Sequence, residues 1–397
     1  MPGPLQGIKI LDLTTVVMGP FATQILAELG AEVIKVETHD GDNMRYPGPM
    51  KNPGMGYMFL HLNRGKRSIV LDLKNPKGRA ALLRILAKQD VLVYNVRPQA
   101  MARLGLSYEE VKAINPRIIY VGAYGYSQRG PYAAKAAYDD LIQGGTGVPW
   151  LMSQNTAQEP RYVPLNLADR VSGLHAVYAV TTALFHRERT GEGQSVEVPM
   201  FESIAHFVLG DHLSGLTYEP PLAERSYARL MARRPYATKD GYLCALVYNN
   251  KQWKSFFAII GRLDMLDDPR YATQASRAAN VSAIYQELAT TMRTRTAAEW
   301  INLLEQADIP VARVNSVDDV VNDPHLTQSG FFSMEQHPSE GAVRSMRTPT
   351  DWSASKPDVQ APAPVLGQHS GEVLREAGLS ENEIAELATL GVIQLAK

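Results

Sequence analysis

The clearest candidate for chemistry in this 397-residue chain is the carboxylate of Asp169. It stands near the start of Ala168–Tyr178, a run of small and apolar residues that predicts a buried helix. The sequence has no His-Glu-x-x-His zinc helix, no Gly-x-Ser-x-Gly elbow and no Gly-x-x-x-x-Gly-Lys phosphate loop. Because it also holds a single cysteine, an enzyme built on this chain would work mainly with carboxylate and backbone groups.

Asp169 has two interpretations at this stage. Aspartate is favoured at helix N-termini, where its oxygens accept hydrogen bonds from free backbone N–H groups, and most such residues are caps. In the functional interpretation, the same donors keep the carboxylate ionised for nucleophilic attack. Ser172, Gly173 and Ala176 would then leave room for a bulky electrophile beside it.

A second cluster is basic and consists of Lys74, Arg97 and Arg103. Each follows a predicted strand closely, and the carboxyl ends of parallel strands form the ligand crevice of open α/β sheets. Arginine offers a planar fork for phosphate oxygens and lysine a compact charge, so the three could hold a polyphosphate without a glycine loop. The alternative is a solvated charged rim, which is the more common arrangement.

The turn-rich segment Gly125–Tyr132 precedes a further pair of candidates, Tyr138 and Asp139. Tyr138 could line a ligand and Asp139 could hydrogen-bond to it, although capping of the helix that starts there explains Asp139 equally well. No metal site is expected, because His175 and His206 fall on apolar helices where core or interface packing is the simpler interpretation. Cys244 lies in a strand pattern and is expected in the core.

The elements that would position these residues alternate between short apolar runs and helical segments. Capping signals include Asn75-Pro76 and the capping-box pair Ser107 and Glu110. The rhythm predicts an α/β fold with a mainly parallel sheet covered by helices. The expected strands are 8–13, 32–37, 68–73, 91–95, 118–123 and 195–198. The first strand-to-helix turn, Thr14–Pro20, lacks Gly-x-Gly-x-x-Gly, which argues against a nicotinamide cofactor.

Length and composition predict two domains and a cytoplasmic protein. The 397 residues exceed what one core usually supports. A net charge of −1, with 40 basic and 41 acidic residues, favours neither nucleic acid nor membrane partners. The single cysteine fits a reducing compartment. We expect a large domain, a smaller α+β domain and two linkers, divided as 1–205 (large domain, first part), 206–225 (linker), 226–325 (small domain), 326–345 (linker) and 346–397 (return to the large domain).

Several ordered motifs along nearly the whole chain resemble the family III CoA-transferases, the group that contains formyl-CoA transferase and carnitine CoA-transferase. The similar segments are Pro4–Gly7, Leu26–Glu37, Asn63–Lys74, Asn95–Pro98, Arg103–Leu106, Asn115–Arg117, Arg187–Gln194 and Leu366–His369. The order of these matches is far more specific than any one of them.

This resemblance implies a ping-pong transfer of CoA from an acyl-CoA thioester to a carboxylic acid, with Asp169 as the nucleophile that carries CoA as an aspartyl thioester. CoA is then part of the substrate, and no tightly bound cofactor is expected. The resemblance also implies a homodimer of two interlocked chains, an exception to the usual unthreaded topology. The residues that would border CoA are Leu71, Asp72, Leu73, Lys74, Asn95, Val96, Arg97, Arg103, Tyr138 and Asp139.

The chain departs from the formyl-CoA transferases in several places. They carry glutamine at the position of Val17, arginine at that of Thr38, and a glycine-rich loop near 246–250, so formate and oxalate are poor substrate candidates. The sequence does not identify the donor or acceptor acid. A cluster of arginines could recognise a second substrate carboxylate or simply form a surface run: Arg225, Arg229, Arg233 and Arg234.

Two other functions stay open. An α-methylacyl-CoA racemase shares the family fold and the aspartate but uses an acid/base pair for proton exchange, with histidine where this chain has Tyr138. Tyrosine at that position favours transfer. A non-catalytic CoA-binding protein would keep the basic crevice but would have no use for Asp169.

Overall fold

The computed structural model describes residues 3–154, 159–223, 228–357 and 361–396. The chain divides into two compact units: a larger one formed by 1–149, 162–208 and 327–397, and a smaller one formed by 150–161 and 209–326. Arg225 of the predicted arginine cluster lies outside the described residues.

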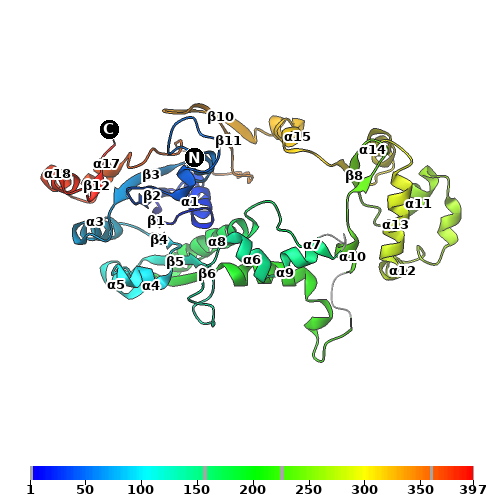
Figure 1. Cartoon of the computed structure of the whole chain (residues 1–397), viewed down its shortest axis with the longest axis horizontal. Helices are drawn as coiled ribbons and strands as arrows, with labels where there is room; N and C mark the ends of the chain where they lie inside the picture. Colours follow the sequence, from blue (N-terminus) through cyan, green and yellow to red (C-terminus); the bar gives the residue numbers. More distant parts are fainter. Residues whose placement is uncertain (1–2, 155–158, 224–227, 358–360, 397) are drawn as a thin grey trace. The chain divides into compact units, whose positions relative to one another are not determined.

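The larger unit is built on a seven-stranded sheet with the order β12-β3-β2-β1-β4-β5-β6 (Figure 1). All neighbouring strands are parallel except the pair of β12 and β3. The predicted α/β fold with a mainly parallel sheet is therefore confirmed. The strands are β1 Lys9–Leu13, β2 Glu32–Glu37, β3 Lys66–Leu71, β4 Val91–Tyr94, β5 Ile119–Tyr124, β6 Ser195–Pro199 and β12 Ile393–Gln394.

Helices cover both faces of this sheet (Figure 1). One face packs against α3 Pro76–Leu86, α4 Pro98–Arg103, α5 Tyr108–Ile114, α17 Ser370–Glu376 and α18 Glu381–Thr389 around a single apolar core. The other face is covered by α1 Met18–Glu28 and by the long α8 Leu167–Thr190, which pack on each other. The unit also contains α2 Tyr57–Leu62, α6 Asp139–Gly145 and an antiparallel hairpin of β10 Phe332–His337 and β11 Gly341–Met346.

Among the predicted strands, β3 differs most from the structure, because it spans 66–71 rather than the predicted 68–73. The strand begins earlier because Lys66 is buried and ion-paired with Asp12 of β1, so a charged residue serves as an interior strand position. It ends earlier because the Asp72 carboxylate accepts the backbone N–H of Lys74 at 3.0 Å and turns the chain. The capping box predicted at Ser107 forms, and capping boxes also form at Thr296 and Ser380.

The smaller unit has its own core around Trp253, Phe256, Phe257 and Trp300. Its three-stranded antiparallel sheet has the order β7-β8-β9. The elements are α10 Ala228–Ala232, β7 Tyr236–Ala237, β8 Tyr242–Ala245, α11 Asn250–Ile259, α12 Gln274–Ala279, α13 Val281–Met292, α14 Ala297–Gln306, β9 Val311–Arg313 and α15 Val317–Val321. Three helices cross the boundaries between the two units: α7 Val148–Ser153, α9 Met200–His212 and α16 Pro324–Gln328.

Candidate active site

Asp169 lies in the first turn of α8, as its sequence context predicts. The sequence predicts that the small residues after Asp169 leave room for a ligand. This prediction is wrong. Ser172, Gly173 and Ala176 are all buried. A Cβ added to Gly173 would stand 2.9 Å from the backbone oxygen of Met18 in α1. Small side chains at these positions therefore allow α8 to pack closely on α1, which fixes the helix end that carries Asp169.

Asp139 is the first residue of α6, and its carboxylate links α6 to α8. One oxygen accepts the backbone N–H of Asp169 at 3.0 Å, and the other accepts the side-chain amide of Gln143 at 2.6 Å. Asp139 thus satisfies one of the free N–H groups at the N-terminus of α8. The structure places the two carboxyl residues Asp139 and Asp169 together, although they are thirty positions apart in sequence.

The carboxylate of Asp169 is not a helix cap. Among the described residues it accepts no hydrogen bond, and the pKa of its carboxyl group is raised to about 7. Burial is the main cause, the charge of Asp139 adds to it, and Arg170 opposes both. The expectation that backbone donors keep this carboxylate ionised is therefore wrong: the N–H of Asp169 itself is bonded to Asp139, and no described donor is bonded to the Asp169 carboxylate.

Arg170 and Gln143 belong to this site, although the sequence did not single them out. The Arg170 guanidinium lies 4.5 Å from the centre of the Phe21 ring in α1, and burial lowers the pKa of Arg170. The sequence does contain a signal for Arg170, because this cation directly follows the candidate carboxylate Asp169. The role of Gln143 depends on the packing of α6 against α8, which the sequence does not show.

The predicted CoA-bordering residues after β3 differ in exposure. Leu71 is the last residue of β3, and its side chain packs in the main core, so it presents only backbone to a ligand. Asp72 and Leu73 are half-buried, and Lys74 is exposed. These residues follow the carboxyl end of β3, the edge where a parallel sheet places its ligand crevice.

A second group lies at the same edge of the sheet, after β4. The Asn95 side chain is already hydrogen-bonded within the protein. It accepts the backbone N–H of Thr15 at 3.0 Å and donates to the backbone oxygen of Thr15 at 2.7 Å. Val96 and Arg97 are exposed, and Arg103 is exposed at the end of α4. Because β2 and β1 separate β3 from β4, the two groups lie about 14 Å apart by strand spacing.

The turn between β1 and α1 has a strained backbone, and a hydrogen bond to Asp42 stabilises it. Val16 has a φ of +72°, a left-handed conformation that β-branched residues rarely adopt. Its N–H donates to the Asp42 carboxylate at 3.1 Å. Val17, at the position where formyl-CoA transferases carry glutamine, is buried at the start of α1, while Thr38 is exposed. Strain of this kind persists only where its surroundings enforce it.

A buried network of charged side chains holds the β1–α1 turn in this conformation, and the sequence did not reveal it. Asp12, Lys35, Asp42 and Lys66 are fully buried, with Lys35 Nζ 2.8 Å from Asp42 and Lys66 Nζ 3.1 Å from Asp12. The lysines hold the pKa of Asp12 at about 2, against the opposing effect of burial. In the sequence, charged residues inside otherwise apolar strands are the feature that indicates such a buried network.

Two further expectations concern lone side chains. Cys244 was expected in the core, but its thiol-bearing side chain is exposed because it alternates with the buried Leu243 along β8. His175 is half-buried and His206 is exposed. Within the described ranges, no three His, Cys, Asp or Glu side chains are placed to hold a metal ion. No helix in the same ranges is long and apolar enough to cross a bilayer.

Comparison with known proteins links this site to one family. CoA-transferase family III matches residues 5–370. A succinate–glutarate CoA-transferase of Agrobacterium fabrum is 32% identical over 382 residues, covering 94% of this chain and 95% of that protein. A formyl-CoA:oxalate CoA-transferase of Escherichia coli is 31% identical, with 98% and 99% covered. The crystal structure of a CAIB/BAIF family protein from Brucella suis is 30% identical, has a TM-score of 0.81 and covers 95% of this chain and 100% of its own.

Proposed function

Because this chain belongs to CoA-transferase family III, we propose that it moves CoA from an acyl-CoA thioester to a carboxylic acid by a ping-pong mechanism through Asp169. The enzyme class follows from the family. The nucleophile, the covalent intermediate and the acids are the parts that we propose here.

In the proposed first half-reaction, a carboxylate oxygen of Asp169 attacks the thioester carbonyl and expels CoA thiolate, which leaves a mixed anhydride. The thiolate then attacks the aspartyl carbonyl of that anhydride and releases the donor acid as its carboxylate. The product is an aspartyl-CoA thioester. In the second half-reaction, the acceptor carboxylate attacks this thioester and the same two steps run in reverse. No proton is consumed overall, and the thioester energy is conserved.

The single observation that carries this proposal is the state of the Asp169 carboxylate. It is partly buried, lies in the first turn of a rigidly packed helix and accepts no hydrogen bond from the described residues. A carboxylate that is poorly solvated and has no donor attached is a stronger nucleophile than one that caps a helix. With a pKa of about 7, a large fraction of it is ionised at neutral pH.

We further propose that the basic side chains at the carboxyl edge of the sheet bind the phosphate groups of CoA. Lys74, Arg97 and Arg103 are exposed, and none of them has a carboxylate partner among the described residues. The Arg97 guanidinium makes only a long contact of 3.4 Å with the Ala134 oxygen. Cations without carboxylate partners at a ligand-binding edge suit a polyphosphate. The other proposed CoA-bordering residues are Leu71, Asp72, Leu73, Asn95, Val96, Tyr138 and Asp139.

The proposed enzyme is a homodimer of interlocked chains. Leu174, Tyr178 and Phe185 are 52%, 58% and 62% exposed and lie on one face of α8 at helical spacing. An apolar stripe on a long helix is typical of a surface that a partner covers. The segments 206–225 and 326–345 stay our predicted linkers, which would wrap the partner chain.

The test is capture of the covalent intermediate by intact-protein mass spectrometry. Succinyl-CoA with glutarate is the first pair to try, because the Agrobacterium relative is named for these two acids. The donor alone should leave a CoA-sized adduct that maps to Asp169, is released by hydroxylamine and disappears when the acceptor is added. A panel of other acyl-CoA donors extends the test to other acids.

The racemase alternative predicts a different outcome. An acid/base enzyme would exchange the α-proton of a 2-methylacyl-CoA with deuterated solvent and would form no adduct. Absence of an adduct with every donor, together with such exchange, would refute the transferase mechanism.

A further inference from the structure

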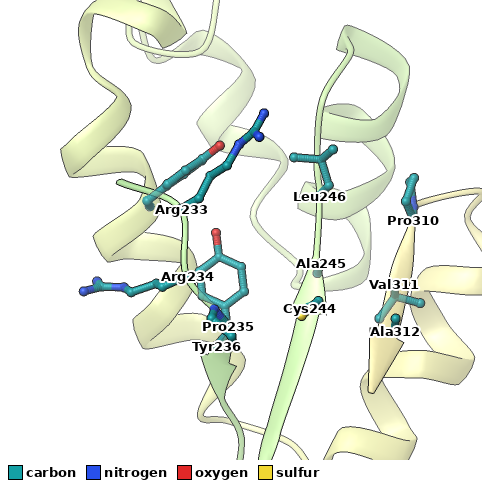
Figure 2. A pocket seen from close by; sticks show the side chains of 11 residues that line it. Arg233, Arg234, Pro235, Tyr236, Cys244, Ala245, Leu246, Pro310, Val311 and Ala312 are labelled. Carbon is teal, nitrogen blue, oxygen red and sulfur yellow. The ribbon is translucent and has the colours of Figure 1, made fainter. Parts of the chain in front are cut away.

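The smaller unit contains a pocket of about 560 Å³ that the proposed transfer chemistry does not use. It lies at the ends of β7, β8 and β9 against α13, as Figure 2 shows. All the residues that line it belong to the smaller unit. The pocket can therefore be analysed without reference to Asp169.

One side of the pocket is polar and has unused hydrogen-bond donors. Tyr236 and Tyr285 are only 4% and 8% exposed, yet neither hydroxyl is hydrogen-bonded within the described residues. The guanidinium of Arg233 likewise has no carboxylate or carbonyl partner there. Figure 2 shows the Arg233 side chain extending toward the Leu246 side of the pocket, above the ring of Tyr236.

The other side of the pocket is apolar. It is formed by Ala245 and Leu246 at the end of β8 and by Pro310 and Val311 at the start of β9. Ala245 and Val311 are paired across the two antiparallel strands, so this wall is held by the sheet. No aspartate or glutamate lines the pocket among the residues that the structure describes. A cation and two phenols face an aliphatic wall, an arrangement that suits an anion attached to a hydrocarbon chain.

The adjacent Arg234 also borders the pocket, but its guanidinium is hydrogen-bonded elsewhere. Arg234 donates to the Gln286 side chain at 2.8 Å, and Figure 2 shows it pointing away from the strands that form the apolar wall. Among the described residues that line the pocket, Arg233 is therefore the cation whose guanidinium has no partner, and its single charge matches one carboxylate. Burial raises the pKa of Tyr236, and the neighbouring Tyr285 raises it further, so this phenol keeps its proton and remains a donor at neutral pH.

We propose that this pocket is a binding site for an aliphatic monocarboxylate. Its carboxylate binds Arg233 and the hydroxyls of Tyr236 and Tyr285, and its chain packs on Leu246 and Val311. Two sources share this chemistry: a free acid that takes part in the transfer reaction, and a separate acid that regulates the enzyme. This binding site is separate from the proposed transfer mechanism at Asp169, and the acid can bind whether or not that mechanism is correct.

The test is calorimetric titration of the full-length protein with hexanoate, with hexanamide as the neutral control. Hexanoate should bind and hexanamide should not. Arg233→Gln should weaken hexanoate binding by about tenfold or more, since a charge-assisted hydrogen bond is lost. Tyr236→Phe and Tyr285→Phe should each weaken it several-fold.

Arg234→Gln is the matched control, because its guanidinium is already bound to Gln286 and should leave the affinity unchanged. Unchanged thermal unfolding of Arg233→Gln shows that the variant is folded. The proposal is overturned if wild-type protein does not bind hexanoate, or if Arg233→Gln binds it as tightly as wild type or as Arg234→Gln.

Two further measurements separate the site from the transferase and identify the source of the acid. Hexanoate should still bind to Asp169→Asn, so failure of the proposed mechanism does not remove this site. If the bound acid is a substrate, Arg233→Gln raises the KM for hexanoate as acceptor and leaves the kcat near the wild-type value. If it is an effector, hexanoate changes the rate of transfer between two other acids, and Arg233→Gln abolishes that change.

Discussion

Asp12 and Asp169 are two carboxylates of the same unit that experience opposite electrostatic surroundings. Asp12 is fully buried in β1 and receives hydrogen bonds from the hydroxyls of Thr14 and Thr23 as well as from Lys66. Its pKa is lowered to about 2. Asp169 is less buried, but its close neighbour is the carboxylate of Asp139, and its pKa is raised to about 7.

Burial alone therefore does not decide the protonation of a carboxyl group. Desolvation raises the pKa of both, and the sign of the neighbouring charge determines the net shift. The surroundings of Asp12 complete a structural network that supports the β1–α1 turn. The surroundings of Asp169 raise the pKa of its carboxyl group to about 7, and its oxygens accept no hydrogen bond from the described residues, which is the condition that the proposed nucleophile needs.

The largest expected effect is on catalysis. Asp169→Asn should lower kcat by about 10⁴-fold, because an amide cannot form the acyl anhydride or carry CoA. The measurement is the steady-state rate of CoA transfer between a donor thioester and an acceptor acid. Asp140→Asn, at an exposed carboxylate in the same helix as Asp139, should leave the rate unchanged. A rate within tenfold of wild type for Asp169→Asn would show that Asp169 is not the nucleophile.

The second effect is on stability and concerns Asp12. Lys66→Met removes the cation that binds Asp12 and leaves a buried charge with less compensation, so the free energy of unfolding should fall by about 3 kcal/mol. Urea denaturation followed by circular dichroism measures the change. As a control, Lys77→Met breaks the exposed ion pair with Glu386 and should cost less than about 1 kcal/mol. Equal losses for the two variants would contradict the distinction between buried and exposed pairs.

The third effect is on pH dependence. Asp139→Asn removes the like charge beside Asp169, so the pKa of Asp169 should fall below its value of about 7. The acid limb of the kcat/KM profile should move down by about one pH unit, and activity should extend to lower pH. A limb that remains near pH 7 in this variant would mean that another group controls it.

The smallest effect is on stability as a function of pH. The folded-state pKa of Asp169 lies above the ordinary value of 3.8, so the folded state holds this proton between those two values while the unfolded state releases it. Wild-type stability therefore decreases as the pH rises from about 4 to 7. Asp169→Asn lacks this contribution, and its melting temperature should exceed that of wild type by a few degrees at pH 8 but differ little at pH 4. A difference that is independent of pH would disprove the charge effect.

Much of this protein follows from its sequence. The alternation of apolar strands with capped helices indicates the parallel sheet, because buried strands need continuous apolar residues and helices need N-terminal hydrogen-bond acceptors. The β2 strand lies at 32–37 as expected, and the Ser107 and Ser380 capping boxes form. Asp169 also emerged from its local context, since an acidic residue at the start of a small apolar helix is a local feature.

Only the tertiary structure decided what surrounds that carboxylate. The sequence suggested that backbone donors bind Asp169 and that small residues leave space beside it. In the fold, Asp139 takes the donor, and Gly173 brings α8 against α1. The pairing of Asp12 with Lys66 and the pocket below Arg233 likewise join residues that are distant in sequence. Local patterns determine which elements form, whereas pKa values and pockets depend on distances between elements, and those distances exist only after the chain has packed.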